Sequence, residues 1–233
     1  MILLSDPRVA ALPVHECGEP LVEVGTLPGI RLDPRERDAA GAYGRVRRGV
    51  GERLCLAARQ LPDGIGIAVV EGHREPAEQA RRFARYENQL LASGSVAPGD
   101  AAELRLRTSV FVSPVEVAPH CAGAAVDVTL VGPDGYELDM GGAVNGHRTG
   151  DEASCPMAAG GLSATARRNR ALLAEVLGAA GAGLVNYPTE WWHWSYGDRY
   201  WALMTGAPAA VYGPVGADDA QGEGRGPAGA VLP

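Results

Sequence analysis

Two segments contain side chains that could bind a metal or catalyse a reaction. The first has a histidine followed seven residues later by an aspartate. His120 and Asp127 belong to the segment HCAGAAVD, which runs into the apolar stretch Ala124–Leu130. Because seven is an odd offset, the two side chains can converge only if the chain turns between them, at Gly123. An aspartate in an apolar strand must be paired or bound to a metal. Either Asp127 pairs with an arginine and His120 is a surface turn residue, or both bind a metal.

The second segment is EWWH, with a carboxylate and an imidazole three residues apart. Glu190 and His193 open an aromatic stretch, Glu190–Tyr196, that predicts a strand. At this spacing the imidazole could bind a metal while the carboxylate takes a proton from the metal's water. The alternative is an exposed aromatic edge with Glu190 in solvent. Adjacent tryptophans are rare in a chain with 6% aromatic residues, which favours a specific packing role for this segment.

Together the two segments offer three ligands for one zinc ion. His120, Asp127 and His193 would leave the fourth tetrahedral position to water, which is the arrangement of catalytic rather than structural zinc. Zinc would lower the pKa of that water to about 7, and Glu190 would act as the general base. We therefore expect one Zn²⁺ per chain. The sequence has no H-E-x-x-H motif, so the helical arrangement of the zincins is excluded.

A fixed positive charge near this site is expected from Arg74, which follows the predicted strand Ile65–Val70. A guanidinium there could stabilise the oxyanion of a tetrahedral intermediate, an effect typically worth about 3 kcal/mol per donor. The alternative is a surface arginine, because all 21 basic residues of the chain are arginines. Cys121, beside His120, could compete as a soft zinc ligand, but a small buried thiol is the favoured interpretation.

The composition excludes several classes of function. Lysine is absent, which removes a Walker-type phosphate loop, a pyridoxal-phosphate Schiff base and a Ser–Lys nucleophile pair. A net charge of −7 argues against a nucleic-acid partner. No apolar run approaches the roughly 20 residues that span a bilayer, and the N-terminal segment lacks the basic region of a secretory signal. We therefore expect a cytoplasmic protein without a membrane partner; the sequence indicates no oligomeric state.

The candidate residues must be positioned by a mixture of helices and strands. Helical periodicity predicts helices over Glu36–Leu61, Glu75–Leu91 and Ser163–Ala180, the last capped by Ser163 and stopped by Gly181. Strands are predicted over Ile65–Val70, Ala124–Leu130, Glu190–Tyr196 and Tyr200–Met204, with Thr108–Val117 as an edge strand or loop.

These elements do not alternate regularly along the chain of 233 residues. The predicted class is therefore α+β, a single domain with a small antiparallel sheet flanked by helices. The catalytic domain is predicted over residues 1–212. The Gly/Pro/Ala-rich residues 213–233 are expected to be disordered, because they cannot bury enough apolar surface.

The motifs, taken together, resemble the VanX-type D-alanyl-D-alanine dipeptidases, a family of zinc D,D-peptidases. The resemblance runs in order from about residue 30 to 205, through EGxR (71–74), HxxGxAxD (120–127), DMG (139–141), NR (169–170) and EWWH (190–193). It implies zinc on His120, Asp127 and His193, Glu190 as the catalytic base and Arg74 as the transition-state stabiliser. The implied reaction is hydrolysis of a small dipeptide, D-alanyl-D-alanine, in peptidoglycan metabolism.

Three predicted substrate-binding positions depart from the family's pattern. Ala118 replaces a serine and loses a hydroxyl contact, and Glu71 replaces an aspartate. Asn145 stands where the family's aspartate would help to hold the substrate's ammonium group, unless the longer Glu71 restores that charge. One alternative is therefore a site retuned to another small peptide or amide. Another is a zinc-binding module without activity, which the retention of Glu190 and Arg74 disfavours.

Overall fold

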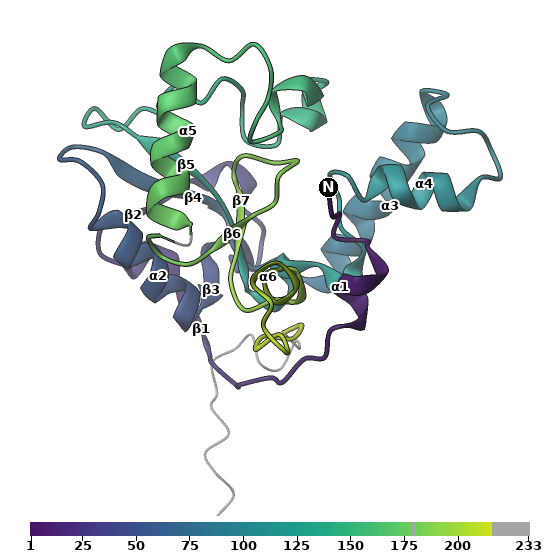
Figure 1. Cartoon of the computed structure of the whole chain (residues 1–233), viewed down its shortest axis with the longest axis horizontal. Coiled ribbons are helices and arrows are strands. Elements are labelled where there is room, and N and C mark those ends of the chain that lie inside the picture. The colour runs from purple at the N-terminus through teal and green to yellow at the C-terminus, as the bar shows by residue number, and fades with distance from the viewer. Residues whose placement is uncertain (179, 216–233) are drawn as a thin grey trace, which may run out of the picture.

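The computed structural model describes residues 1–178 and 180–215, and a mixed five-stranded sheet of order β2-β4-β5-β7-β6 runs through its centre (Figure 1). The strands are β2 (Ile30–Leu32), β4 (Gly66–Glu71), β5 (Ala125–Val131), β7 (His193–Ser195) and β6 (Val185–Asn186). Neighbouring strands are antiparallel, except that β2 pairs with β4 in parallel. The predicted α+β class with a small sheet flanked by helices is confirmed.

The two central strands determine where functional side chains lie. All seven residues of β5 are buried, because the strand is covered on both faces. Asp127 in this strand lies directly opposite Glu71 of β4 and His193 of β7. Strand register alone therefore brings two of the predicted ligands together. A smaller antiparallel pair, β1 (Leu21–Glu23) and β3 (Arg45–Arg47), lies outside this sheet.

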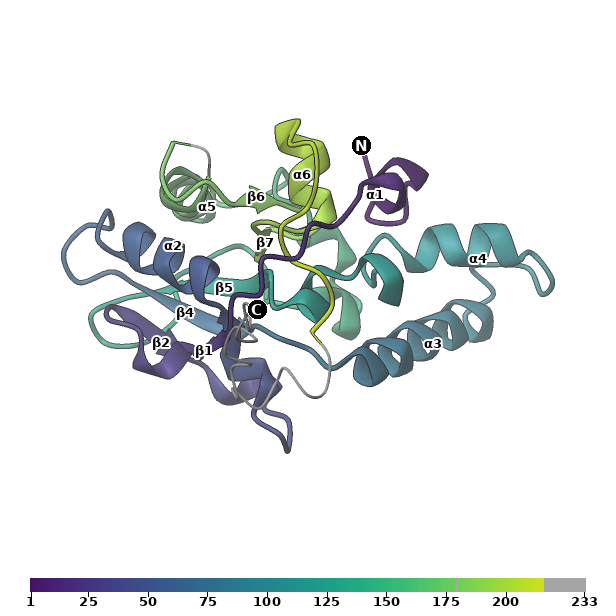
Figure 2. The same ribbon diagram turned by 90° about the horizontal axis from the view of Figure 1, so that it is seen from below.

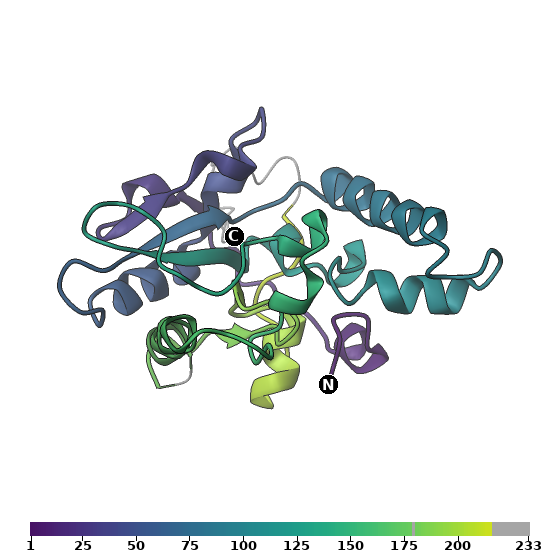
Figure 3. The same ribbon diagram turned by 90° about the horizontal axis from the view of Figure 1, so that it is seen from above.

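Helices cover the sheet and extend beyond it. The helices α2 (Arg48–Ala58) and α5 (Ala164–Leu177) pack on the sheet and on each other, and share the main apolar core with β4 and β5. The hairpin of α3 (Pro76–Ala92) and α4 (Ala101–Thr108) projects to one side as an arm, as the perpendicular views show (Figures 2 and 3). The short helices α1 (Pro7–Ala11) and α6 (Arg199–Thr205) pack together beside the inner end of this arm.

Several predicted elements are confirmed and others are wrong. The helix predicted over Glu75–Leu91 is α3, and the hydroxyl of Ser163 caps α5 by accepting a hydrogen bond from the backbone of Ala166. The helix predicted over Glu36–Leu61 begins only at Arg48. Before it the chain forms 3₁₀ turns and β3, because Gly41 adopts a left-handed φ of 68° that ends helical periodicity.

One predicted strand does not form, and the segment predicted as an edge strand or a loop contains no strand. Tyr200–Met204 is part of α6, because Asp198 caps that helix by accepting a hydrogen bond from the backbone nitrogen of Trp201 at 2.7 Å. Thr108–Val117 contains the last residue of α4, a turn and a 3₁₀ helix over Val115–Val117.

The end of the described chain is packed rather than free. The backbone nitrogen of Gly213 donates to Glu16, and that of Val215 donates to the carbonyl of Cys121. The rest of the tail predicted to be disordered, residues 216–233, lies outside the described residues. None of the helices found in residues 1–178 and 180–215 combines the length and apolar character needed to cross a membrane.

Candidate metal centre and its cleft

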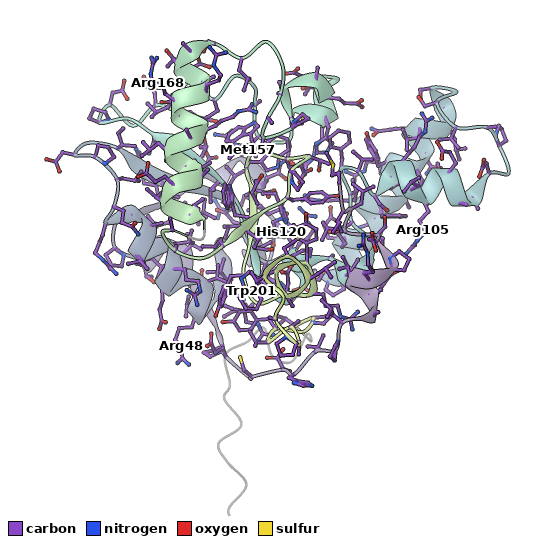
Figure 4. All side chains as sticks on the ribbon, in the orientation of Figure 1. Arg48, Arg105, His120, Met157, Arg168 and Trp201 are labelled. Atoms are coloured by element: carbon purple, nitrogen blue, oxygen red, sulfur yellow. The ribbon has the colours of Figure 1, made fainter. Side chains whose placement is uncertain are left out.

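The three predicted ligands come from three short elements that meet at the middle of the molecule. His120 lies in a 3₁₀ helix, Pro119–Ala122, that ends at Gly123 with a left-handed φ of 63°, so the turn expected there is present. Asp127 and His193 face each other across the β5–β7 ladder. Figure 4 shows His120 centrally, where the arm of α3 and α4 joins the body of the protein. All three residues are buried.

The distances between the ligand atoms suit a single ion. His120 Nε2 lies 3.3 Å from Asp127 Oδ1 and 3.2 Å from His193 Nδ1, and these last two atoms are 3.1 Å apart. A tetrahedron with metal–ligand bonds of about 2.0–2.1 Å has edges of about 3.3 Å. The three atoms therefore form the face of such a tetrahedron.

The hydrogen bonds around these atoms also fit a cation. His120 Nδ1 donates to the carbonyl of Gly72 at 2.6 Å, which leaves the Nε2 lone pair directed at the cluster. Without a metal, a proton on Asp127 Oδ1 or His193 Nδ1 could form a hydrogen bond across one of the three contacts between the ligand atoms, but not across all three. In the absence of a metal, burial would raise the pKa of Asp127, but His120 and His193, when protonated, hold it well below its usual value through charge and hydrogen bonds. The donor set of two imidazoles and one carboxylate thus fits a metal ion.

The thiol next to the cluster is not a competing ligand. Cys121 is fully buried, and this burial raises the pKa of its thiol to about 12. Among the described residues, the ligand atoms that lie within reach of one another belong to His120, Asp127 and His193, and the Cys121 thiol is not among them. The interpretation as a small buried thiol is confirmed.

Glu190 lies beside the cluster on the turn that leads into β7. Its Oε2 is 3.9 Å from His193 Nδ1, and its carboxylate accepts no hydrogen bond from the described residues. Burial raises the pKa of Glu190 well above its usual value, and the negative charge of Asp127 adds to this effect. The neighbouring tryptophans, Trp191 and Trp192, are fully buried, so the alternative of an exposed aromatic edge is excluded.

Arg74 is a buried residue and not a surface arginine. Its Nε donates to Glu71 Oε1 at 2.9 Å, its Nη2 donates to the other Glu71 oxygen, and its Nη1 donates to Gln79. Two of its five N–H groups remain for another partner. Arg82 also donates to Glu71, at 3.0 Å, so two guanidinium groups share one carboxylate. Burial would raise the pKa of Glu71, but these arginines lower it to about 2.

A cleft of about 170 Å³ opens onto the cluster. Its lining includes the candidate ligands, Glu190 and Arg74, together with side chains of the α3 arm and of the segment 145–148. Four arginines line it, namely Arg74, Arg82, Arg85 and Arg148. The carboxylates that line it among the described residues are Asp127 and Glu190.

Only one of the three predicted substrate residues lies in this cleft. Asn145 lines it, in a left-handed conformation with φ 61°, and donates its amide to Glu36 at 3.3 Å. The structure does not bring Glu71 into the cleft, because both of its oxygens bind arginines. Ala118 is buried and lines a separate cavity of about 20 Å³.

The sequence did not identify two features of the cleft. His147, two residues after Asn145, lines it and is buried, yet no motif marks this histidine. The arginines of α3 were also missed, because their position depends on how the arm folds back against the sheet. The available signal for His147 was that the chain has only five histidines.

Comparisons with known proteins point to one family. Residues 56–205 match the family model of the M15 peptidases, described as D-Ala-D-Ala dipeptidase, and this segment contains every predicted site residue. A D-alanyl-D-alanine dipeptidase from Synechocystis sp. (strain ATCC 27184 / PCC 6803 / Kazusa) is 30% identical over 226 residues. The aligned region covers 82% of this chain and 87% of that relative.

Proposed function

The chain belongs to the M15 peptidase family of D-Ala-D-Ala dipeptidases, and from this premise we propose that it hydrolyses D-alanyl-D-alanine with one bound zinc ion. Family membership makes the chain a metallo-dipeptidase; the metal, the base and the substrate are the proposal. The observation that carries it is the face of three ligand atoms, 3.1–3.3 Å apart, beside the buried carboxylate of Glu190.

In this proposal His120, Asp127 and His193 hold the zinc ion. The ion would supply Lewis-acid chemistry, polarising the scissile carbonyl and favouring ionisation of the attacking water. The chain's contribution is preorganisation: the Gly72 carbonyl fixes the tautomer of His120, and the lowered pKa keeps Asp127 ionised.

Glu190 is the proposed general base. It takes a proton from the attacking water and delivers it to the nitrogen of the leaving amino acid as the peptide C–N bond breaks. A free amine and a carboxylate are the products. Its position beside the ligand atoms, 3.9 Å from His193 Nδ1, and its raised pKa support this role, because they place a stronger base next to the attacking water.

Arg74 is the proposed stabiliser of the oxyanion. Glu71 and Gln79 hold its guanidinium in one orientation, so no reorganisation is needed when negative charge develops. Arg82 shares the Glu71 carboxylate, so Glu71 does not pair with Arg74 alone; Arg82 itself also pairs with Glu36 and Glu78. Glu71 would thus act through Arg74 and not by contacting the substrate.

A second candidate substrate is favoured by the charges of the cleft. A free dipeptide carries an ammonium group, and both carboxylates lining the described cleft, Asp127 and Glu190, already have roles. Asn145 offers only a neutral amide oxygen, since its nitrogen donates to Glu36. A small peptide or amide with a blocked, uncharged amino end would avoid the cost of an unpaired charge.

Three peptides distinguish these candidates. Zinc-loaded protein would be assayed for kcat/KM on D-Ala-D-Ala, N-acetyl-D-Ala-D-Ala and L-Ala-L-Ala, in wild type and in Asn145→Asp. The dipeptidase proposal expects cleavage of free D-Ala-D-Ala and discrimination against both other peptides. Preference for the acetylated peptide, with free D-Ala-D-Ala improved by Asn145→Asp, would favour the second candidate. Cleavage of none of the three would refute the D-Ala-D-Ala assignment.

The wider setting stays a prediction from the sequence. We propose that residues 1–212 form the catalytic unit, that the protein acts in the cytoplasm, and that it has no nucleic-acid or membrane partner. The proposed ligands, base and arginine all lie between residues 74 and 193, within this unit.

A further inference from the structure

His147 occupies a slot between aromatic rings at the edge of the cleft. It lies in the 3₁₀ helix Gly146–Thr149, and 4% of its side chain is exposed. Its ring stacks on Phe111 at 4.9 Å with an interplanar angle of 10°, and lies at 21° to Trp192 on a centroid distance of 6.1 Å. Tyr86 packs edge-on against it. Burial lowers the pKa of His147 to about 4, so the ring is neutral at physiological pH.

Packing alone does not explain a histidine at this position. A phenylalanine would stack equally well, whereas His147 Nδ1 is buried without a hydrogen-bond partner among the described residues. A buried polar atom without a partner carries a free-energy cost. The polar group facing it is Glu190, whose Oε1 lies 3.9 Å from Nδ1.

Each oxygen of the Glu190 carboxylate faces a different histidine. Oε1 faces His147, and Oε2 faces His193 in the metal centre, each at 3.9 Å. Hydrogen bonds of catalytic groups are often long in the free enzyme and shorten when substrate is bound. A neutral imidazole can donate from one nitrogen, and here the buried Nδ1 is the one directed at the carboxylate.

We propose that His147 is a positioning residue for Glu190: its Nδ1–H donates to Oε1 and holds Oε2 toward the metal centre. The inference rests on the proposed role of Glu190 as general base. Without this donor the carboxylate would lose its fixed orientation, so proton transfer would slow while substrate binding would change little.

Three substitutions of His147 separate a hydrogen-bond role from a packing role. Asparagine carries its amide nitrogen as many bonds from the backbone as Nδ1, whereas glutamine carries its nitrogen one bond further away, as Nε2 is. Phenylalanine keeps the stacked ring and has no donor. In zinc-loaded protein, His147→Phe should lower kcat by about tenfold or more while KM, zinc content and the thermal unfolding midpoint stay close to wild type. His147→Asn should recover most of kcat, and His147→Gln should not.

Two results would overturn the inference: full kcat in His147→Phe, or equal kcat in the asparagine and glutamine variants. A readout independent of any peptide is the ¹⁵N NMR spectrum of histidine-labelled, zinc-loaded wild type. It should show His147 as the Nδ1–H tautomer, with that signal shifting in Glu190→Gln; an Nε2–H tautomer contradicts the inference. If wild type cleaves none of the peptides yet His147 is the Nδ1–H tautomer, the substrate assignment fails while the contact between His147 and Glu190 stands.

Discussion

Ionisation of the buried carboxylate of Asp198 should lower the free energy of unfolding of the protein at neutral pH. One of its oxygens accepts hydrogen bonds from the backbone of Trp201 at 2.7 Å and from the hydroxyl of Ser195 at 3.1 Å. The other oxygen, Oδ2, is buried without a partner among the described residues. Burial raises the pKa of Asp198 from 3.8 to about 6, despite the lowering effect of these hydrogen bonds.

The sign and size of the effect follow from linkage. Because the pKa is higher in the folded state, its contribution to stability is fully present below pH 3.8 and is lost as the pH rises through about 6. A shift of about two pKa units corresponds to a loss of about 3 kcal/mol, of which about 2 kcal/mol falls between pH 4.5 and 7.5.

The substitution Asp198→Asn removes the ionisation of this side chain and so isolates its effect on stability. Asparagine keeps the acceptor oxygen for Trp201 and Ser195, and its amide resembles the protonated carboxyl group in placing a donor where Oδ2 lies. The variant should exceed wild type by about 1 kcal/mol at pH 4.5 and by about 3 kcal/mol at pH 7.5. Its advantage should therefore grow by about 2 kcal/mol between the two pH values, or roughly 4–8 °C in the thermal midpoint.

Thermal unfolding of both metal-free proteins at the two pH values would measure the effect. A matched control is Asp134→Asn, since Asp134 is exposed and its side chain also accepts from a backbone nitrogen, that of Tyr136. The control should show no comparable pH-dependent gain. A difference between Asp198→Asn and wild type that is the same at both pH values would refute the reasoning.

Three further predictions concern the metal centre and its neighbours. Purified protein should bind about one zinc ion, lose activity to chelators and lose zinc in a His120→Ala/His193→Ala double variant, as measured by metal analysis; zinc retained by that variant would place the site elsewhere. Glu190→Ala should keep zinc and fold but lower kcat by about 10²–10⁴-fold in a steady-state assay, because proton transfer alone is removed. Arg74→Ala should lower kcat/KM through lost oxyanion stabilisation, and Glu71→Gln should lower it less, by loosening Arg74. Either alanine variant that keeps more than about a tenth of wild-type kcat/KM, a loss below roughly 1.4 kcal/mol, would show that its role is misassigned.

The metal cluster could be predicted from the sequence because its signals are local. A histidine and an aspartate around a glycine can share a site only if that glycine turns the chain, and Gly123 does so. The turn containing Glu190 could likewise be identified from its paired tryptophans, which are buried. In each case a few adjacent residues are enough to predict the position of the side chains that form the cluster.

The cleft could not be predicted, because its walls come from distant segments. His147 and Tyr86 face each other only after the α3 arm has folded back, and neither lies in a motif. The error over Tyr200–Met204 has a different cause. Its aromatic residues favour a strand, but the cap at Asp198 favours a helix, and the structure follows the cap.

Strand register connects the metal centre to the arginine that faces it. Between β4 and β5, Val69 pairs with Val128 and Glu71 pairs with Asp127, so β4 carries one extra residue, Val70, in a bulge. In a regular ladder Val70 would stand opposite Asp127, and Glu71 would be turned to the other face. The bulge therefore brings the carboxylate that orients the guanidinium of Arg74 to the same face as a metal ligand.

The residue after the bulged strand completes this connection. The carbonyl of Gly72 accepts the hydrogen bond that orients His120, and a side chain at Gly72 would approach the carbonyl oxygen of Arg45 to 2.3 Å. Only glycine lets the chain pass this close to its neighbour. The bulge at Val70 thus positions the carboxylate that orients Arg74, and Gly72 positions the metal ligand His120, so the site depends on two adjacent features at the end of β4.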